Sequence, residues 1–484
     1  MLGIVSYGAY VPRLRLQRDV VVKSNSWFDP GLAAHRAGER AMCNFDEDAL
    51  TMAVEAVRDC LLGLDAAPVS DLHLASTSLP YASRLNASVV AQALNLPDEL
   101  GAMDITASLR GGTSALINAL RGDAQRATLV VASDRRKAKV ASAHELTNGD
   151  AAAAMLVGSQ GVIAEALATH SQTIDMVDQY RGAQDATSTY WEERWIRDEG
   201  HLKQIPAAIA TALGKAGLAA AQVDRLCVAV SAKGLPQKLA KMAGIDAARV
   251  QDVLSAQIGN TGAAHPLLML ANTLGQAAPG EVIVLIAFGQ GVDVLVLRAT
   301  DALTRLPRRR GVAGWLAAGR KEESYLKFLA FNDLLPLEKG MRAEADKLTP
   351  LSLEYRHRRA LHGFMGAVCK SCGTFQWPKM DICINPDCGA MNTQEEVPFA
   401  DRPARLMSYT ADRLAYSLSP PACYGMVEFE GGGRLMMDLT DVDAAQLEVG
   451  LPLRMSFRIK AVDAVRGYTR YFWKASVATT LEEN

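Results

Sequence analysis

The strongest chemical signal in the sequence is a group of four cysteines in its C-terminal third. Two residues separate the first pair, ten lie between the pairs and four separate the second pair: Cys369, Cys372, Cys383 and Cys388. Two such pairs can close a tetrahedral thiolate site on Zn²⁺, and four protein ligands leave no open position for a substrate, so the spacing predicts a structural zinc. Gly373 and Gly389 suit the tight turns that aim the sulfur atoms at one point. A rubredoxin-like iron centre is the alternative, which the longer second spacing disfavours.

The other cysteines are scattered along the chain: Cys43, Cys60, Cys227 and Cys423. The chain has 484 residues, and its start, MLGIVSYGAYVPRLRL, lacks the basic residues and long apolar run of a secretory signal. A disulfide framework is unusual in so long a chain without an export signal. We therefore expect free thiols in a reducing compartment and predict a cytoplasmic protein.

The composition is that of an ordinary globular protein. The chain is 49% hydrophobic and 21% charged, with a formal net charge of -2, which provides ample core and argues against disorder. The balanced charge gives no reason to expect a nucleic acid or a membrane surface as partner. No apolar run reaches the roughly 18 residues that a membrane-spanning helix needs, so no membrane span is predicted.

The elements that must position any chemistry in residues 1–300 alternate between strand and helix. Helices rich in alanine and leucine are expected at Asp48–Leu62 and Gly112–Ala119. The segments around them include short apolar, β-branched runs that are typical of buried strands. The expected strands are Ala127–Ser133, Ala151–Val157, Leu226–Val230, Val282–Phe288 and Val292–Leu297.

This strand pattern occurs twice. LVVASD followed by GDAAAAMLVG is similar to VIVLIAFGQGVDVLVL, because each is a strand, a turn and a second strand. The similarity indicates an internal duplication. The sequence therefore predicts an α/β fold with two related halves, at residues 1–165 and 166–305.

The composition changes after residue 300. Leu306–Arg310 is basic and contains proline, which suggests a linker or a solvated turn, and we assign residues 306–362 to this linker and a charged helical segment. The zinc ribbon would occupy residues 363–395. Short strands with glycine turns then predict a small β-barrel over residues 396–484. The expected strands are two runs in Tyr424–Leu439, divided by Gly431-Gly432-Gly433, followed by Leu453–Val462 and Thr469–Val477.

Several segments resemble the thiolase superfamily. They are GIVSYGAYVPRLRL, DEDALTMAVEAV, LVVASDRR, HELTNGDAAAAMLVG and QIGNTGAAHPLLMLA. They look most like the branch of 3-hydroxy-3-methylglutaryl-CoA synthase and ketoacyl synthase III, over about residues 1–300. The cysteine cluster and the strands after it resemble the zinc-ribbon and OB-fold family that accompanies thiolase-like enzymes, over about residues 320–480. The resemblance implies a duplicated five-layered αβαβα sandwich, followed by a four-cysteine zinc ribbon and an OB-fold barrel.

In the resembled family a cysteine at the N-terminus of a buried helix forms an acyl-enzyme, and the helix dipole lowers its pKa. That cysteine falls in a D-x4-C-x-G-x3-A-L pattern, and here Leu109 stands at its position between Asp104 and Gly111. Leucine cannot form a thioester, so no acyl-cysteine is expected. Ser108 is adjacent, but one residue rotates a helical side chain by about 100°, so an N-terminal helix cap is its better interpretation.

Two further functional positions of the family differ. Its catalytic glutamate lies in a segment like SESHPYA, and Ser76–Ala82 reads STSLPYA with Thr77 at the acid position. Its histidine segment corresponds to Val230–Gly234, which contains no histidine. Of the family's functional set, Asn260 in GNTGAA is the residue that matches. Three changes together indicate altered chemistry.

These departures lead to one preferred function and two alternatives. The preferred hypothesis is an acyl-CoA enzyme that acts on a C–C bond without covalent catalysis, as a retro-aldol lyase on a 3-hydroxyacyl-CoA thioester. One alternative is an acyltransferase of the 3-hydroxy-3-methylglutaryl-CoA synthase or thiolase type with an unexpected nucleophile. Cys227, in a buried strand, and Cys43, in a loop, fit that role poorly. The other alternative is a non-catalytic scaffold subunit of a thiolase complex.

A retro-aldol reaction needs a base, an acid and hydrogen-bond donors at the thioester oxygen. Asn260 is the candidate that orients or polarises the thioester, unless it only stabilises its loop. His265, at the start of an apolar helix, is the candidate base, with a buried histidine or a CoA contact as the alternative. Tyr81 is the third candidate, with packing as its alternative, and Asp134 is expected to be structural.

The resemblance brings in coenzyme A as part of the substrate, and its phosphates and pantetheine arm favour a basic rim and a narrow apolar tunnel. A basic run after a strand could supply the rim, although a solvated loop fits it as well: Arg135, Arg136, Lys137 and Lys139. The barrel could hold the acyl part in its groove. Nucleic acid, another ligand of OB folds, is not expected, because stacking aromatics on a basic surface are not evident. A homodimer or a larger thiolase-type assembly is expected.

Overall fold

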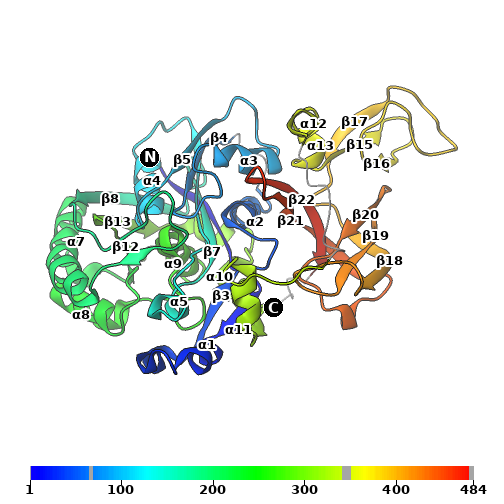
Figure 1. Ribbon diagram of the computed structural model, residues 1–484. Coiled ribbons are helices and arrows are strands. Elements are labelled where there is room, and N and C mark those ends of the chain that lie inside the picture. Colours follow the sequence, from blue (N-terminus) through cyan, green and yellow to red (C-terminus); the bar gives the residue numbers. More distant parts are fainter. Residues whose placement is uncertain (1, 65–68, 341–349, 479–484) are drawn as a thin grey trace. The chain divides into compact units, whose positions relative to one another are not determined.

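The computed structural model describes residues 2–64, 69–340 and 350–478, which divide into two compact units (Figure 1). The first unit is made of Met1–Cys43, Asp48–Ser88 and Pro97–Leu329, and the second of Asn44–Glu47, Val89–Leu96 and Ala330–Asn484. Among the described residues, no helix has the length and apolar character needed to cross a membrane.

The first half of the first unit contributes five strands to a mixed sheet. In spatial order they are β5 (Gly101–Ile105), β4 (Val69–Ala75), β6 (Ala127–Asp134), β7 (Ala151–Gly158) and β1 (Gly3–Tyr10). Strand β4 is parallel to β5 and β6, whereas β7 is antiparallel to β6 and β1. Small and β-branched apolar side chains fill β6 and β7, as expected for strands that are buried on both faces.

The second half repeats this arrangement. Its strands are, in spatial order, β8 (Ala164–Thr173), β13 (Gly291–Ala299), β12 (Val282–Phe288) and β11 (Arg225–Val228). Strands β11 and β12 are parallel, and β13 is antiparallel to both β12 and β8. A parallel bridge between Leu226 and Val250 stands where the first half has β5. The strand order therefore shows the duplication that the sequence predicts.

Helices form three layers around these strands. Helix α2 (Ala49–Leu61) packs on β1, β6 and β7, and α7 (Leu202–Ala216) packs on β8, β12 and β13 beside α8 (Leu235–Met242), as Figure 1 shows. Helices α4 (Gly111–Leu120) and α9 (His265–Leu274) contact each other and strands of both halves, so they form the central layer. The result is the predicted αβαβα sandwich.

Local sequence explains where α2 begins. The Asp48 carboxylate accepts hydrogen bonds from the backbone of Leu50 and Thr51, and the Thr51 hydroxyl accepts one from the backbone of Asp48. This capping box satisfies backbone donors that have no partner inside the helix. The predicted helices Asp48–Leu62 and Gly112–Ala119 match α2 and α4 to within one residue.

The predicted linker Leu306–Arg310 is packed against the first unit. Arg309 is only 7% exposed. The backbone N–H groups of Arg310 and Gly311 donate to the buried carboxylate of Asp59 at 2.9 and 3.0 Å. These backbone donors satisfy the buried acceptor, so this segment is not a linker. The first unit continues to residue 329.

The helical segment predicted before the cysteines is present in the described residues. It contains α10 (Gly311–Ala317), α11 (Tyr325–Phe331), α12 (Leu351–Arg356) and α13 (Arg358–Leu361). The ribbon that follows is a three-stranded sheet in the order β16 (Phe375–Gln376), β15 (Met365–Cys369) and β17 (Gln394–Pro398).

The second unit ends in the predicted OB-type barrel, coloured orange to red in Figure 1. Its strands are, in spatial order, β20 (Arg434–Asp438), β19 (Ala422–Phe429), β18 (Ala404–Asp412), β21 (Pro452–Asp463) and β22 (Tyr468–Val477). A bridge between Leu439 and Ala475 brings the two edges together. The buried ring of Phe364 contacts Phe399, Phe429 and Trp473, so the ribbon and the barrel share an aromatic core.

Candidate functional site

The turn that carries Leu109 has an unusual backbone. It lies between β5 and α4, and Ala107 has a φ of +74°, in the left-handed region. The Ser108 hydroxyl donates to the carbonyl of Gly289 at 3.1 Å and lies 3.3 Å from the backbone nitrogen of Arg110. Ser108 therefore stabilises the turn, and Arg110 rather than Ser108 occupies the cap position of α4. Leu109 is half-buried.

The second half of the chain holds this turn in place. A Cβ atom on Gly289 would lie 3.0 Å from Ser108 Oγ and 3.2 Å from the backbone nitrogen of Leu109, so glycine permits the close approach of the β12–β13 loop. Arg110 pairs with the fully buried Asp293 of β13 at 2.9 Å and donates to the Gly289 carbonyl at 3.0 Å. The backbone of the Leu109 turn is thus well supported although it carries no thiol.

The segment Ser76–Ala82, where we expect Thr77 at the family's glutamate position, is bound to a buried carboxylate. Asp134 is fully buried at the end of β6. It accepts hydrogen bonds of 2.6 to 3.0 Å from Ser76 Oγ, Thr77 N, Thr77 Oγ1, Ser78 Oγ and Ala263 N. Gly262 has a φ of +62°, and a Cβ atom there would lie 2.2 Å from Asp134 Oδ2. Asp134 therefore has the structural role that we expected, and it engages the Thr77 hydroxyl.

Asn260 meets the segment that lacks the family's histidine. Its Oδ1 accepts hydrogen bonds from Arg136 Nη1 and from the backbone of Gly262, both at 2.9 Å. These two donors fix the amide orientation. The Nδ2 atom then faces Ser231 Oγ at 3.3 Å. Asn260 thus lies against Ser231 of Val230–Gly234, the segment that we expect to match the family's histidine segment.

Arg136 is a buried cation whose guanidinium donates only to neutral groups in the described part of the chain. It is 7% exposed, and in addition to Asn260 its guanidinium donates to Gln179 Oε1 at 2.7 Å and to the Tyr190 hydroxyl at 2.9 Å. Across residues 2–64, 69–340 and 350–478, no carboxylate oxygen lies within the 4.0 Å of an ion pair with this guanidinium. Of the predicted basic run, Lys139 is solvated but Arg136 is not.

Tyr190 adds a hydroxyl group to this cluster. Its oxygen accepts from Arg136 and from Asn148 Nδ2 at 2.9 Å each, and its own hydrogen has no acceptor in the described part of the chain. The His144 ring stacks on Tyr190 with centroids 3.3 Å apart. Burial, and next the charge on Arg136, lower the pKa of His144 to about 4, so His144 is neutral at pH 7.

Asp178 is a buried carboxyl group beside the same cluster. It is 7% exposed, and its Oδ1 accepts from Gln290 Nε2 at 2.6 Å and from the backbone of Gln179 at 2.8 Å. Gln290 directly follows Gly289, which contacts the Leu109 turn. Burial raises the pKa of Asp178, and the Gln179 N–H and the Arg136 charge oppose that rise. A buried carboxyl group with a raised pKa suits general acid–base work.

The other two predicted residues have different surroundings. His265 begins α9 at 1% exposure, with Nδ1 3.4 Å from Thr261 Oγ1. Burial, then the charge on Arg136, lower its pKa to about 4, which favours the alternative of a buried neutral histidine. Tyr81 is partly exposed, and the Arg84 guanidinium lies 4.7 Å from its ring centroid.

The cysteines of the first unit are buried. Burial raises the pKa of Cys60 to about 12 and that of Cys227 to about 11, so both are thiols at pH 7. Cys43 is 2% exposed and lies with its sulfur 3.7 Å from Met52 Sδ. None of these three side chains has the exposure of a reactive thiolate.

In the second unit the four predicted metal ligands converge. Their sulfur atoms all lie within 4.8 Å of one another: Cys369, Cys372, Cys383 and Cys388. Two of the separations are 4.0 and 3.6 Å, and a tetrahedral site with Zn–S bonds of about 2.3 Å places sulfurs about 3.8 Å apart. Gly373 and Gly389 have left-handed φ values of +75° and +55°. The Thr393 hydroxyl lies 3.2 Å from Cys369 Sγ and lowers the pKa of that thiol, which favours the metal-binding thiolate.

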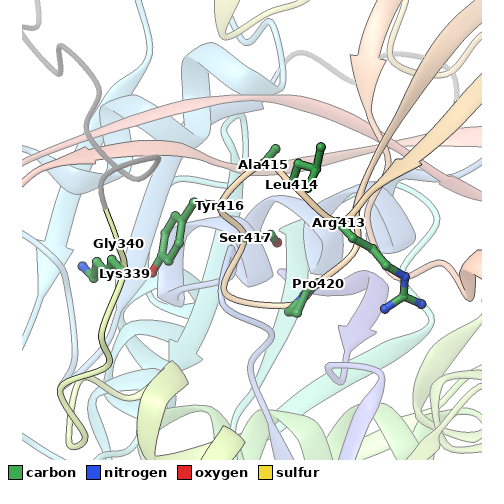
Figure 2. A pocket seen from close by; sticks show the side chains of 8 residues that line it. All are labelled: Lys339, Gly340, Arg413, Leu414, Ala415, Tyr416, Ser417 and Pro420. Atoms are coloured by element: carbon green, nitrogen blue, oxygen red, sulfur yellow. The ribbon is translucent and has the colours of Figure 1, made fainter.

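A separate hollow of about 500 Å³ lies in the second unit (Figure 2). It is lined by Lys339, Gly340, Arg413, Leu414, Ala415, Tyr416, Ser417 and Pro420. Tyr416 points toward Lys339, whose Nζ is 5.9 Å from the ring centroid, and Arg413 extends away from them. The lining includes none of the catalytic or metal residues predicted from the sequence.

Two family profiles match parts of the chain. The profile described as 3-Oxoacyl-[acyl-carrier-protein (ACP)] synthase III C terminal matches residues 213–297. The profile described as ChsH2, C-terminal OB-fold domain matches residues 396–458. The first match runs through α8, α9 and β11–β13, and the second covers barrel strands β18–β20 and part of β21.

Known proteins are similar to about two thirds of the chain. A hydroxymethylglutaryl-CoA synthase from Archaeoglobus fulgidus is 29% identical over 333 residues, which are 66% of this chain and 95% of that protein. A protein of the same name from Methanosarcina acetivorans is 30% identical over 324 residues, 64% of this chain and 91% of the relative. The crystal structure of an HMG-CoA synthase complexed with CoA covers 72% of this chain and 92% of its own, with a TM-score of 0.58 and 19% identity. This last likeness shows a common fold.

Proposed function

This chain belongs to the hydroxymethylglutaryl-CoA synthase family of thiolase-fold acyl-CoA enzymes, and on that premise we propose that it cleaves a C–C bond in a 3-hydroxyacyl-CoA thioester by a retro-aldol reaction. The substrate would carry coenzyme A as its thiol part. The enzyme would work in the cytoplasm as a homodimer or a larger thiolase-type assembly.

The observation that carries the proposal is the hydrocarbon side chain of Leu109. The turn around it keeps the strained backbone of Ala107 and the close approach of Gly289, so the position is well defined, but it offers no nucleophile. The buried thiols of Cys60 and Cys227 are protonated at neutral pH. A retro-aldol reaction passes through no acyl-enzyme, which makes it compatible with these residues.

The proposed reaction needs neither an oxidant nor a second molecule of coenzyme A. A base takes the proton of the β-hydroxyl group, and the electrons of that O–H bond form a carbonyl at Cβ. The Cα–Cβ bond breaks, and its electron pair moves onto the thioester as an enolate. Protonation at Cα then gives a shorter acyl-CoA together with an aldehyde or a ketone.

Two side chains of the first unit suit this chemistry. Asp178 is our candidate base in place of His265, because its raised pKa and its link through Gln290 to the Leu109 turn suit proton transfer. The Nδ2 group of Asn260 is our candidate donor to the thioester oxygen, since its Oδ1 is already held by Arg136. Tyr81 stays a prediction for the proton donor.

The cysteine cluster is proposed to bind Zn²⁺ in a structural role. Four thiolates would fill the tetrahedral coordination sphere, and the sulfur separations of 3.6 and 4.0 Å suit that ion. Bound zinc would hold the two knuckles of the ribbon together beside the barrel. It would supply no open coordination position for a substrate.

A synthase-type acyltransferase is the second candidate, because the curated relatives at 29–30% identity have the name hydroxymethylglutaryl-CoA synthase. That activity needs a nucleophile to carry the acyl group. In the described part of the first unit, the three cysteines are buried, which argues against this candidate.

The two candidates separate in one experiment. The purified chain is incubated with a panel of 3-hydroxyacyl-CoA and 3-oxoacyl-CoA esters, with and without free CoA, and the products are identified by mass spectrometry. Cleavage of 3-hydroxyacyl esters without added CoA supports the lyase. A strict need for CoA, or an acyl group attached to the protein, contradicts it and supports acyl transfer. Turnover that appears only when a second protein is added contradicts both and indicates a scaffold.

A further inference from the structure

A buried positive charge, with no carboxylate at ion-pair distance in the residues that the structure describes, lies within the first unit's candidate site. We propose that Arg136, Tyr190 and the Asn260 amide form an oxyanion-binding site that receives the enolate oxygen of a CoA thioester. This inference rests on the proposed retro-aldol function, because that reaction is what generates the enolate.

The first observation in support is the burial of the Arg136 guanidinium among neutral acceptors, which destabilises the folded protein. A buried charge is destabilising unless a charge of opposite sign lies against it. Arg136 is only 7% exposed, yet the three acceptors of its guanidinium are the neutral oxygens of Asn260, Gln179 and Tyr190. An anionic ligand would supply the missing negative charge.

The neighbouring carboxylates are engaged elsewhere. Asp150 accepts the backbone N–H of Arg136, but its carboxylate also accepts from Cys43 N and lies 3.6 Å from the Arg40 guanidinium. Asp134 is saturated by the donors of the Ser76–Ser78 segment and Ala263. Asp178 is within electrostatic range of Arg136 but beyond ion-pair distance, and it accepts two other hydrogen bonds.

The second observation in support is that three neighbouring groups each have a hydrogen-bond donor without an acceptor in the described residues. Arg136 Nη1 has two hydrogens and gives one to Asn260. The Asn260 Nδ2 group has two and faces one acceptor, Ser231. The Tyr190 oxygen receives two hydrogen bonds, and its own hydrogen finds no acceptor in the residues that the structure describes. Preorganised donors of this kind stabilise a charge that develops during a reaction.

The third support is the place of these donors in the fold. Asn260 is the residue that matches the family's functional set, and Gln179 of the same cluster follows Asp178, whose partner Gln290 adjoins the Leu109 turn. The cluster is therefore linked through Asp178, Gln290 and Gly289 to the turn where we expect the family's nucleophile position. A solvated basic residue such as Lys139 suits the phosphates of CoA, whereas the buried guanidinium suits a single oxygen anion.

Binding of two CoA thioethers tests the proposal without turnover. S-carboxymethyl-CoA carries an anionic carboxylate about where the enolate oxygen would lie, and S-acetonyl-CoA is a neutral compound of similar size. Dissociation constants for the full chain are measured by calorimetry. We expect the wild type to bind the anionic probe at least about tenfold more tightly, as charge-assisted hydrogen bonds predict.

Three variants complete the experiment. Arg136→Gln should lose the preference for the anionic probe while its affinity for the neutral probe stays within about twofold. Arg194→Gln removes the same charge from an 80% exposed side chain and should behave as the wild type. Tyr190→Phe keeps the ring stacked on His144, and its affinity for the anionic probe alone should fall about threefold. This variant replaces Arg136→Gln as the test if Arg136→Gln does not fold.

The outcomes separate this inference from the proposed function. Equal weakening of both probes in Arg136→Gln, or an unchanged preference, overturns the oxyanion site. If the preference depends on Arg136 but no ester of the product panel is cleaved, the oxyanion site is supported and the lyase proposal fails. If esters are cleaved without CoA but the preference does not depend on Arg136, the lyase proposal is supported and the oxyanion site fails.

Discussion

The cysteine cluster of the ribbon and the Leu109 turn of the sandwich both match known motifs, but they differ in which part of the motif is present. In the ribbon the four side chains that would bind a metal are all present, and their sulfur atoms converge within 4.8 Å. At the Leu109 turn the backbone is closely held, with a positive φ at Ala107 and a close glycine at position 289, but residue 109 is a leucine without reactive chemistry. A closely held backbone conformation therefore does not by itself imply a reactive side chain.

The difference has a physical cause. A structural metal site tolerates little change in its side chains, because each thiolate both binds the metal and constrains the fold. The Leu109 turn is held by other groups, among them the Arg110–Asp293 ion pair at 2.9 Å and the Ser108 hydrogen bond to Gly289. These contacts do not involve the side chain of residue 109, which can change without loss of the turn.

The largest expected effect is in the ribbon. Cys372→Ser should reduce bound metal from one per chain to almost none and lower the melting temperature of the second unit, since structural zinc contributes on the order of 10 kcal/mol. Metal analysis and calorimetry measure both. Cys423→Ser, outside the cluster, is the control and should retain the metal. Full metal retention in Cys372→Ser, or iron in the wild type, would be evidence against the zinc site.

The next effect is in the sandwich, at the candidate base. Asp178→Asn should lower kcat for ester cleavage by about 100-fold or more. The wild-type rate should rise with pH through the raised pKa of Asp178, and this rise should disappear in the variant. The control is Asp185→Asn at an exposed carboxylate. An unchanged pH profile in Asp178→Asn would exclude Asp178 as the base.

Replacement of Asp178 should also change the stability of the protein, in the opposite direction to its effect on activity. Burial raises the folded-state pKa of Asp178 above its unfolded value, so the protonated form favours folding. That stabilisation is present below the unfolded pKa and is lost as the pH rises through the folded pKa. At neutral pH Asp178→Asn should therefore unfold at a higher temperature than the wild type, although its activity is lower. Thermal unfolding of both proteins across a pH series measures this difference.

The smallest effect tests the retained turn itself. Leu109→Cys places a thiol before α4, where the helix N-terminus should lower its pKa. We expect faster alkylation by iodoacetamide than in the wild type, and a slow mass increase of one acyl group with acetyl-CoA. Turnover should change little, because the segments Ser76–Ala82 and Val230–Gly234 contain neither the glutamate nor the histidine that the resembled family uses. A folded variant that resists alkylation would show that position 109 faces away from the reagents.

Patterns local in sequence predicted much of this molecule. Apolar runs located β6, β7, β12 and β13, glycines divided β19 from β20, and cysteine spacing located the metal ligands. Each of these signals is complete within about twenty residues. The linker assignment at Leu306–Arg310 failed because basic residues suggest solvent, whereas the backbone there donates to the buried carboxylate of Asp59.

The candidate site depends on contacts that no local pattern contains. Arg136 appeared in the sequence as part of a basic run, and its burial becomes evident only when Gln179, Tyr190 and Asn260 surround it. Asp178 lies in a stretch with no helical or strand periodicity. A buried carboxyl group is recognisable only from the elements packed around it. Asn260 was found because a family motif marked it.

The packing of residues 306–311 also decides where this polypeptide can be divided. A fragment ending at residue 305 would leave the Asp59 carboxylate with the Ala9 N–H at 2.9 Å but without those of Arg310 and Gly311. It would also remove β14 (Arg320–Glu322), which pairs with β2 (Leu14–Gln17). Since an under-solvated buried carboxylate costs several kcal/mol, the sandwich should be expressed alone only as a fragment that extends through residue 329.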